Sequence, residues 1–447
     1  MSTQARILCL LLATLCVSHA HGQKLRQGDY MANLAAAERA APDNPAQIGI
    51  PPQEDAARSR LSSFQQALAV RLADVGDTDG AIATFDLLAP MRQLQLPNAV
   101  ARMPAVADAV AEDAIDAIVA QARTKRVVLL NEAHHVPMHR AFARKLAARL
   151  RALGYRYLAC ETFNGGAFDE ARPAAPGRTV QATGYYTKDP AFAGFVNSAL
   201  ADGWTLVAYE ADVAASAPGT ARADRLRLRE EGQARHLVER IFAKDKEAKV
   251  FIYVGYGHVH KNPSGDGATM MAEYLRRMTG LDTLNVDQVQ FFAHPDPRKE
   301  SPAYAGLVKK FVTDAPFVLR APDGSHPLLG NPPGSVDLEV IYPRYAAHAG
   351  RPDWLRTLAG RSPRTIPADL LPRQGRRLVK AYRKDDGADA VPADIVLVEQ
   401  SKPAPALMLP AGEFRYTIED DVAPVAAATG SVARDASAPG SAAAGRP

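Results

Sequence analysis

Histidine and glutamate side chains gather after four short apolar runs in the middle of this 447-residue chain. They are Glu132, His134 and His135 after residues 127–130, Glu161 after 157–160, Glu210 and Asp212 after 205–209, and His258 and His260 after 249–254. If these runs are neighbouring parallel strands, their carboxyl ends share one sheet edge, where ligands bind in α/β proteins. Imidazoles and carboxylates brought together there can take a proton from water or bind a divalent metal.

The sequence signatures of several common chemistries are missing from the chain. It has no Gly-x-Ser-x-Gly nucleophile motif, no phosphate-binding Gly-x-x-x-x-Gly-Lys loop and no Gly-x-Gly-x-x-Gly fingerprint. It also has no His-Glu-x-x-His motif, and Pro137 between His135 and His139 indicates a turn or a helix start rather than a helix interior. Activation of water by histidine and glutamate remains, with or without a metal.

The apolar runs alternate with amphipathic helices, which must position these side chains. Further strands are expected at residues 283–286, 316–320 and 336–342, and helices at 137–153, 191–201, 222–244 and 268–279. Strands and helices that alternate at this spacing predict an α/β fold, with a mainly parallel sheet and helices on both faces.

Two accessory regions flank this core. The apolar spacing in residues 56–90 predicts a helical hairpin that resembles one tetratricopeptide unit, and a single unit cannot form a solenoid. Short apolar runs separated by Pro and Gly predict a small β-rich appendage. The expected regions are a signal peptide (1–20), a lead-in with the hairpin (21–114), the α/β domain (115–345), the β-rich appendage (346–421) and a disordered tail (422–447).

The first residues have the pattern of an export signal. Arg6 precedes the apolar run 7–17, and Ser18-His19-Ala20 offers small residues for cleavage. Cys16 leaves lipidation open, although Leu15 before it is bulkier than a lipoprotein site prefers. We therefore expect a periplasmic or secreted protein, which has no internal disulfide because only Cys160 remains after cleavage.

Composition excludes other classes of protein. With 47% hydrophobic and 23% charged residues, the chain can fold around a sizeable core. The excess of 53 Lys and Arg over 49 Asp and Glu is too small and scattered for a nucleic-acid-binding surface. No apolar run after the signal is long enough to span a membrane. The expected partner is a small-molecule or peptide substrate, and the oligomeric state is left open.

Several of these motifs resemble those of the erythromycin esterase, ChaN and TIKI superfamily, over roughly residues 115–295. The matching residues are Glu132-Ala133-His134-His135, Glu161, Gly255-x-Gly257-His258, and Arg229-Glu230 followed by Gln233-Ala234. His134 matches members with Glu-x-His and His135 those with Glu-x-x-His, so the choice between them stays open. Asn131 stands where the superfamily usually has Gly, and His260 is an additional histidine.

The resemblance implies a superfamily of antibiotic esterases, metal-dependent peptidases and iron- or haem-related periplasmic proteins. Our leading hypothesis is a hydrolase for an ester or amide bond, in which His134 or His135 acts as general base on water, oriented by Glu132 or Glu161. His258 or Arg229 would stabilise the oxyanion or protonate the leaving group.

The sequence leaves two alternatives open. In the first, His134, Glu161, His258 and His260 bind a divalent metal such as zinc, which activates the water. In the second, the protein is a non-enzymatic haem- or iron-associated binding protein of ChaN type. A planar ligand could then lie against Tyr185-Tyr186 and Phe192/Phe195, although aromatic residues at helical spacing more often belong to a core.

Overall fold

The computed structural model describes residues 29–40, 55–87, 102–163, 178–211, 220–262 and 267–421. The expected signal peptide and C-terminal tail lie outside these ranges, as does Asp212. Within these ranges, no helix combines the length and apolar character needed to cross a membrane.

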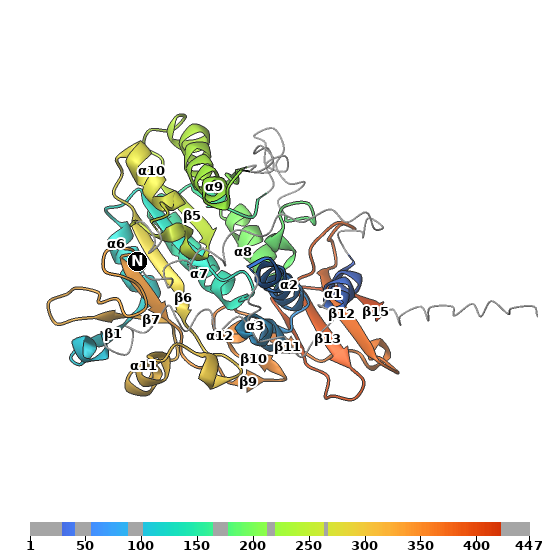
Figure 1. The fold of residues 1–447 in the computed structure, drawn as a ribbon. Helices are drawn as coiled ribbons and strands as arrows, with labels where there is room; N and C mark the ends of the chain where they lie inside the picture. Colours follow the sequence, from blue (N-terminus) through green and yellow to red (C-terminus); the bar gives the residue numbers. More distant parts are fainter. Residues whose placement is uncertain are drawn as a thin grey trace, which may run out of the picture.

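An eight-stranded sheet in the order β1-β7-β8-β6-β2-β5-β3-β4 forms the centre of the fold (Figure 1). The strands are β1 (Val110–Asp113), β2 (Val127–Glu132), β3 (Tyr157–Cys160), β4 (Thr205–Ala208), β5 (Val250–Gly255), β6 (Leu284–Phe291), β7 (Phe317–Arg320) and β8 (Leu338–Ile341). Neighbours from β8 to β4 pair in parallel, whereas β7 is antiparallel to β8 and β1 to β7. The α/β fold with a mainly parallel sheet is confirmed.

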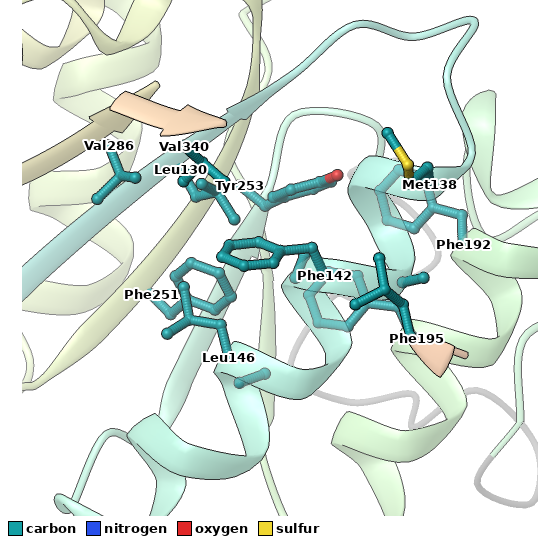
Figure 2. Close-up of a cluster of buried hydrophobic side chains, with 14 of the residues drawn as sticks. Leu130, Met138, Phe142, Leu146, Phe192, Phe195, Phe251, Tyr253, Val286 and Val340 are labelled. Atoms are coloured by element: carbon teal, nitrogen blue, oxygen red, sulfur yellow. The ribbon is translucent and has the colours of Figure 1, made fainter. Parts of the chain in front are cut away.

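Helices cover both faces of this sheet because the buried strand residues alternate in direction. Val128 and Leu130 belong to a hydrophobic cluster with α6 (Ala114–Ala122), α7 (Met138–Ala152) and α8 (Pro190–Ala201). Val127 and Leu129 belong to a second cluster with α9 (Arg222–Leu237) and α10 (Met271–Thr279). Figure 2 shows the first cluster, with Phe142 and Leu146 of α7 beside Phe251 of β5.

The helical hairpin forms as expected and packs against the rest of the molecule. It consists of α2 (Asp55–Asp74) and α3 (Thr78–Asp86), and a further helix, α1 (Tyr30–Arg39), precedes it. The C-terminal region contains the antiparallel sheet β13-β12-β15, made of β12 (Arg376–Arg383), β13 (Asp394–Glu399) and β15 (Phe414–Asp420). Tyr30 and Leu34 of α1 pack with Leu378 and Ile395 of that sheet, so the two ends of the described chain meet (Figure 1).

Candidate functional site

The ends of β2, β5 and β3 lie side by side at the carboxyl edge of the sheet. Glu132 is opposite Gly255 in the β2–β5 pair, and Cys160, just before Glu161, is opposite Tyr253 in the β3–β5 pair. The fold therefore brings the polar segments that follow these strands to one place. Their side chains form two linked groups, one around Glu132 and one around Glu161.

In the first group, Glu132 holds the imidazole of His134. The Nδ1 atom of His134 is 2.8 Å from Oε1 of Glu132, so the tautomer with a proton on Nδ1 donates to the carboxylate and leaves Nε2 as a base. Arg140 donates to both oxygens of Glu132, at 2.8 and 3.1 Å, and to the carbonyl oxygen of His134 at 2.7 Å. Burial alone would raise the pKa of Glu132, but Arg140 and His134 outweigh it and lower the pKa to about 2.

Of the two neighbouring histidines, His134 is the one whose side chain reaches solvent. Its side chain is 12% exposed, whereas His135 is only 1% exposed. The ring of Tyr186 stacks on His134 with the centroids 3.9 Å apart, and Tyr256 meets it edge-on at 5.0 Å. These rings fix the plane of the imidazole.

Gly255 allows His134 and Glu161 to approach the end of β5. A Cβ atom at position 255 would lie 2.5 Å from Nε2 of His134 and 3.0 Å from Oε2 of Glu161, closer than side chains tolerate. The Gly255 N–H instead donates to Oε2 of Glu161 at 2.6 Å. The basic nitrogen and the carboxylate therefore face the same small region.

The second group centres on Arg229 of α9. Its guanidinium donates to Glu161 Oε1 at 2.5 Å, to Glu210 at 2.6 and 3.0 Å, and to His258 Nε2 at 3.1 Å. Burial would raise the pKa of Glu161, but His258, Arg229 and the Gly255 N–H lower it to about 2. The Arg229 side chain is 19% exposed, so a cation lies at the solvent-facing side of the site.

His258 is buried behind Arg229 and is held by a second carboxylate. Its Nδ1 contacts Oε1 of Glu230 at 2.7 Å, and Glu230 also accepts the N–H of Met271 at the start of α10. Burial disfavours the imidazolium, yet Glu230 and Glu161 raise the pKa of His258. Neutral His258 accepts from Arg229 through Nε2, and protonated His258 faces Glu161 Oε1 at 3.7 Å.

His135 lies in a different environment from His134. Its ring stacks on Phe85 of α3 at 3.8 Å, and its Nδ1 is 3.2 Å from the hydroxyl of Tyr256. Tyr256 adopts a φ of 40°, a strained conformation for a residue with a bulky side chain. Such strain is concentrated at functional sites, where the surrounding contacts maintain it.

The structure does not assemble the predicted metal ligands. Nε2 of His260 is 3.1 Å from Oδ1 of Asn331, whereas both ring nitrogens of His258 face Glu230 and Arg229. Across the described ranges, no group of three or more His, Cys, Asp or Glu side chains is placed to hold a metal ion. The described residues therefore do not bring His134, Glu161, His258 and His260 together as one ligand set, and the guanidinium of Arg229 lies between Glu161 and Glu210.

The aromatic wall expected for a planar ligand is also divided. Phe192 and Phe195 are 1% and 0% exposed and belong to the core beneath the sheet edge, as Figure 2 shows. Tyr186 lies on His134, and Tyr185 accepts a hydrogen bond from Arg71 of α2 at 2.8 Å. Of these four aromatic side chains, Tyr186 lies on His134 and Tyr185 packs against Tyr186.

Several residues that shape the site were absent from the sequence-based set. Arg140 and Asp189 form a buried ion pair of 3.0 Å behind Glu132. Tyr186 stacks on His134, Tyr256 contacts His135, and Glu230 holds His258. Arg140 lies eight residues after Glu132 on an amphipathic helix, where an arginine normally faces water. Its burial depends on tertiary contacts with Asp189, so the sequence carried no local signal for it. Glu230 was noted only beside Arg229, as part of the helix motif.

Comparison with known proteins gives a limited result. No family model and no curated protein matches the sequence. Among solved structures, ChaN of Campylobacter jejuni, described with cofacial haem binding, is 11% identical with a TM-score of 0.31, over 51% of this chain and 91% of its own. The type III effector HopBA1 is 17% identical with a TM-score of 0.29, over 42% of this chain and 91% of its own.

A third structure, the C-terminal region of Pasteurella multocida toxin, is described with a thiol-protease-like catalytic triad. It is 10% identical with a TM-score of 0.31, over 80% of this chain and 50% of its own. Similarities this weak assign no function to this chain.

Proposed function

We propose that this protein is an extracytoplasmic hydrolase of the erythromycin esterase, ChaN and TIKI type, which uses His134 to activate water against an ester or amide bond. The observation that carries the proposal is the Glu132–His134 pair. A buried, ionised carboxylate holds one nitrogen of an imidazole whose ring reaches solvent. The same arrangement of base and orienting acid activates water or a hydroxyl in many hydrolases.

His134 would take a proton from water through Nε2. Glu132 keeps the proton on Nδ1 and stabilises the imidazolium that forms, because a negative charge lies 2.8 Å from that nitrogen. Arg140 prevents Glu132 from becoming protonated itself, since it holds the pKa of Glu132 near 2. Tyr186 keeps the ring in one plane during the transfer.

Arg229 would stabilise the negative charge that develops on the carbonyl oxygen. It is held in place by Glu161 and Glu210, so little reorganisation is needed when the charge forms. His258 is buried behind Arg229 and accepts from it through Nε2, so it would hold the guanidinium in place, and His134 would return the proton that it took from water to the leaving group. These roles use Glu132, His134, Glu161, Arg229 and His258 together, and they need no metal.

The direct test is hydrolysis of a panel of model esters and peptides by the purified mature protein. We expect His134→Gln to lower kcat/KM by about 10²- to 10⁴-fold, the usual contribution of a general base. His348→Gln is the matched control, because His348 is exposed and lies on β9 (Ala347–His348), which is outside the central sheet. Full activity of His134→Gln would overturn the proposal, and His135→Gln tests the neighbouring histidine in the same way.

Two further measurements separate the alternatives. If the active protein contains stoichiometric metal and loses its activity on chelation, a metal-dependent mechanism replaces the metal-free one. A Soret band on haem titration, in a protein that hydrolyses no member of the panel, would favour the binding protein. Cell fractionation tests the extracytoplasmic location.

A further inference from the structure

A pocket lies next to the segment that carries His134 and His135, and Val136, Pro137 and Met138 form part of its lining. Its walls come from α3, from the loop that enters α7, and from the segments after β6 and β8. Its lining includes Asp79, Ile82, Met138, Phe292, Tyr345 and Trp354. Its volume of about 90 Å³ corresponds to roughly three water molecules at the ~30 Å³ each takes in the liquid.

The walls of this pocket are apolar and largely rigid. Phe292 and Trp354 are 1% and 5% exposed, so their rings are fixed by the surrounding core. Met138 and Ile82 complete the apolar surface, and both are buried. A short aliphatic chain would therefore lose contact with water without requiring the walls to move.

The electrostatic character of the pocket favours a cation. Among the described residues that line it, Asp79 is the only charged one, and it is exposed to solvent. Asp79 forms no ion pair with any residue in the described ranges. Partial burial and the neighbouring Asp77 raise its pKa, because both disfavour a further negative charge. Aromatic rings such as those of Trp354 and Tyr345 also attract cations at their faces.

Helix capping does not require the carboxylate of Asp79. Helix α3 already has a capping residue, Asp77, whose side chain accepts the N–H of Gly80 at 2.9 Å. A charge in the first helical turn contributes only about 0.3–1 kcal/mol through the helix dipole. The carboxylate is thus available to a ligand.

We propose that this pocket binds a short alkylammonium group, such as a lysine side chain. The aliphatic carbons would contact Ile82, Met138 and Trp354, and the ammonium would pair with Asp79. The pocket wall includes Val136, two residues after His134, so their Cα atoms are within about 7 Å. This assignment rests on the proposed function: the alkylammonium group is part of the substrate that the hydrolase cleaves.

Fluorescence of Trp354 can report binding directly, because the chain has only two tryptophans. In a Trp204→Phe background, Trp354 is titrated with n-butylammonium, n-butanol and butyrate at constant ionic strength. We expect a saturable change with n-butylammonium at least 10-fold tighter than with n-butanol, and none with butyrate. Calorimetry on the wild-type chain gives the same comparison if Trp204→Phe does not fold.

Variants identify the residues responsible. Asp79→Asn is expected to lower n-butylammonium affinity to that of n-butanol, and Asp369→Asn, at an exposed position elsewhere, to leave it unchanged. Ala293→Leu, which adds volume at the wall, should weaken both ligands. Equal binding of butyrate and n-butylammonium, or an unchanged affinity in Asp79→Asn, would overturn the proposal. Because these titrations need no turnover, their failure is distinguishable from a failure of His134 catalysis.

Discussion

At the scale of single residues, the site separates the groups that can react from those that hold them. His134 and Arg229 reach solvent, at 12% and 19% exposure. Glu132, Arg140 and Glu230 lie behind them and are almost fully buried. Buried ion pairs of this kind contribute little net stability, but removing one partner is costly because it leaves an uncompensated charge. Their role is to keep the exposed groups in one orientation and one protonation state.

The Glu132–Arg140 pair predicts a pH-dependent loss of stability. The pKa of Glu132 falls from an ordinary 4.5 to about 2 in the folded protein, so the unfolded chain binds more protons between these values. The stabilisation is present above pH 4.5 and is lost as the pH falls toward 2. We expect Glu132→Gln to cost about 3–5 kcal/mol at neutral pH. In urea unfolding, the difference in unfolding free energy between wild type and Glu132→Gln should shrink as the pH falls. A difference that stays constant would contradict the prediction.

A substitution at Gly255 tests whether the position of the His134 ring matters for activity. Gly255→Ala would place a methyl group 2.5 Å from the His134 ring, so the imidazole must move away from the end of β5. We expect at least a 10²-fold loss of kcat/KM, in line with the cost of misplacing a reacting group by about 1 Å. Gly306→Ala is the control, because its Cβ would meet only the flexible end of Met103, at 3.4 Å. Equal activity of both variants would show that the position of His134 does not matter.

At the scale of elements, strand ends were predictable from the sequence and their supports were not. The runs that became β2, β3, β4 and β5 are apolar and bounded by polar or glycine residues, which is a local signal. β1 escaped prediction because it is an edge strand with a polar, partly exposed pattern, and its pairing with β7 joins residues more than 200 positions apart. Similarly, His260 follows a predicted strand, but its contact with Asn331 depends on a distant loop.

The helical hairpin has a closer connection to the site than its sequence indicated. Phe85 of α3 stacks on His135, and the adjacent Asp86 forms a buried pair with His294 after β6, with Nδ1 to Oδ2 at 2.8 Å. Arg71 of α2 holds Tyr185, next to the tyrosine that stacks on His134. The hairpin therefore belongs to the wall of the site.

The Asp86–His294 pair should hold α3 in place. We expect Asp86→Asn to cost about 1–3 kcal/mol, because it leaves the buried His294 without its charged partner. A double-mutant cycle with His294→Phe measures the coupling between them. A coupling energy near zero would show that the hairpin is held mainly by other contacts.

At the scale of the whole molecule, the first and last described segments pack together. The N–H of Met31 donates to Glu419 of β15 at 2.6 Å, and the Tyr30 hydroxyl donates to the carbonyl of Lys188 at 3.0 Å. Lys188 is the last residue of a short 3-10 helix, Tyr186–Lys188, whose first residue stacks on His134. The C-terminal sheet, which the sequence indicated only as a small appendage, thus supports the segment that carries Tyr186, through contacts that no local pattern could reveal.

Asp394 is the buried acid that joins this sheet to its surroundings. It pairs with Arg351 at 3.1 Å and accepts the Met408 N–H at 2.7 Å, and both partners of the ion pair are about 95% buried. We expect Asp394→Ala to destabilise the protein by about 3–5 kcal/mol, since Arg351 would lose its counter-ion. Thermal unfolding followed by circular dichroism measures this. An unchanged Tm would show that the C-terminal sheet is not coupled to the rest.

The central claim is that His134, held by Glu132, is the base that activates water. The most direct measurement compares kcat/KM of wild type, His134→Gln and the exposed control His348→Gln on the same hydrolysed substrate. We expect a loss of about 10²- to 10⁴-fold in His134→Gln, with the control unchanged. Equal rates in all three proteins would contradict it.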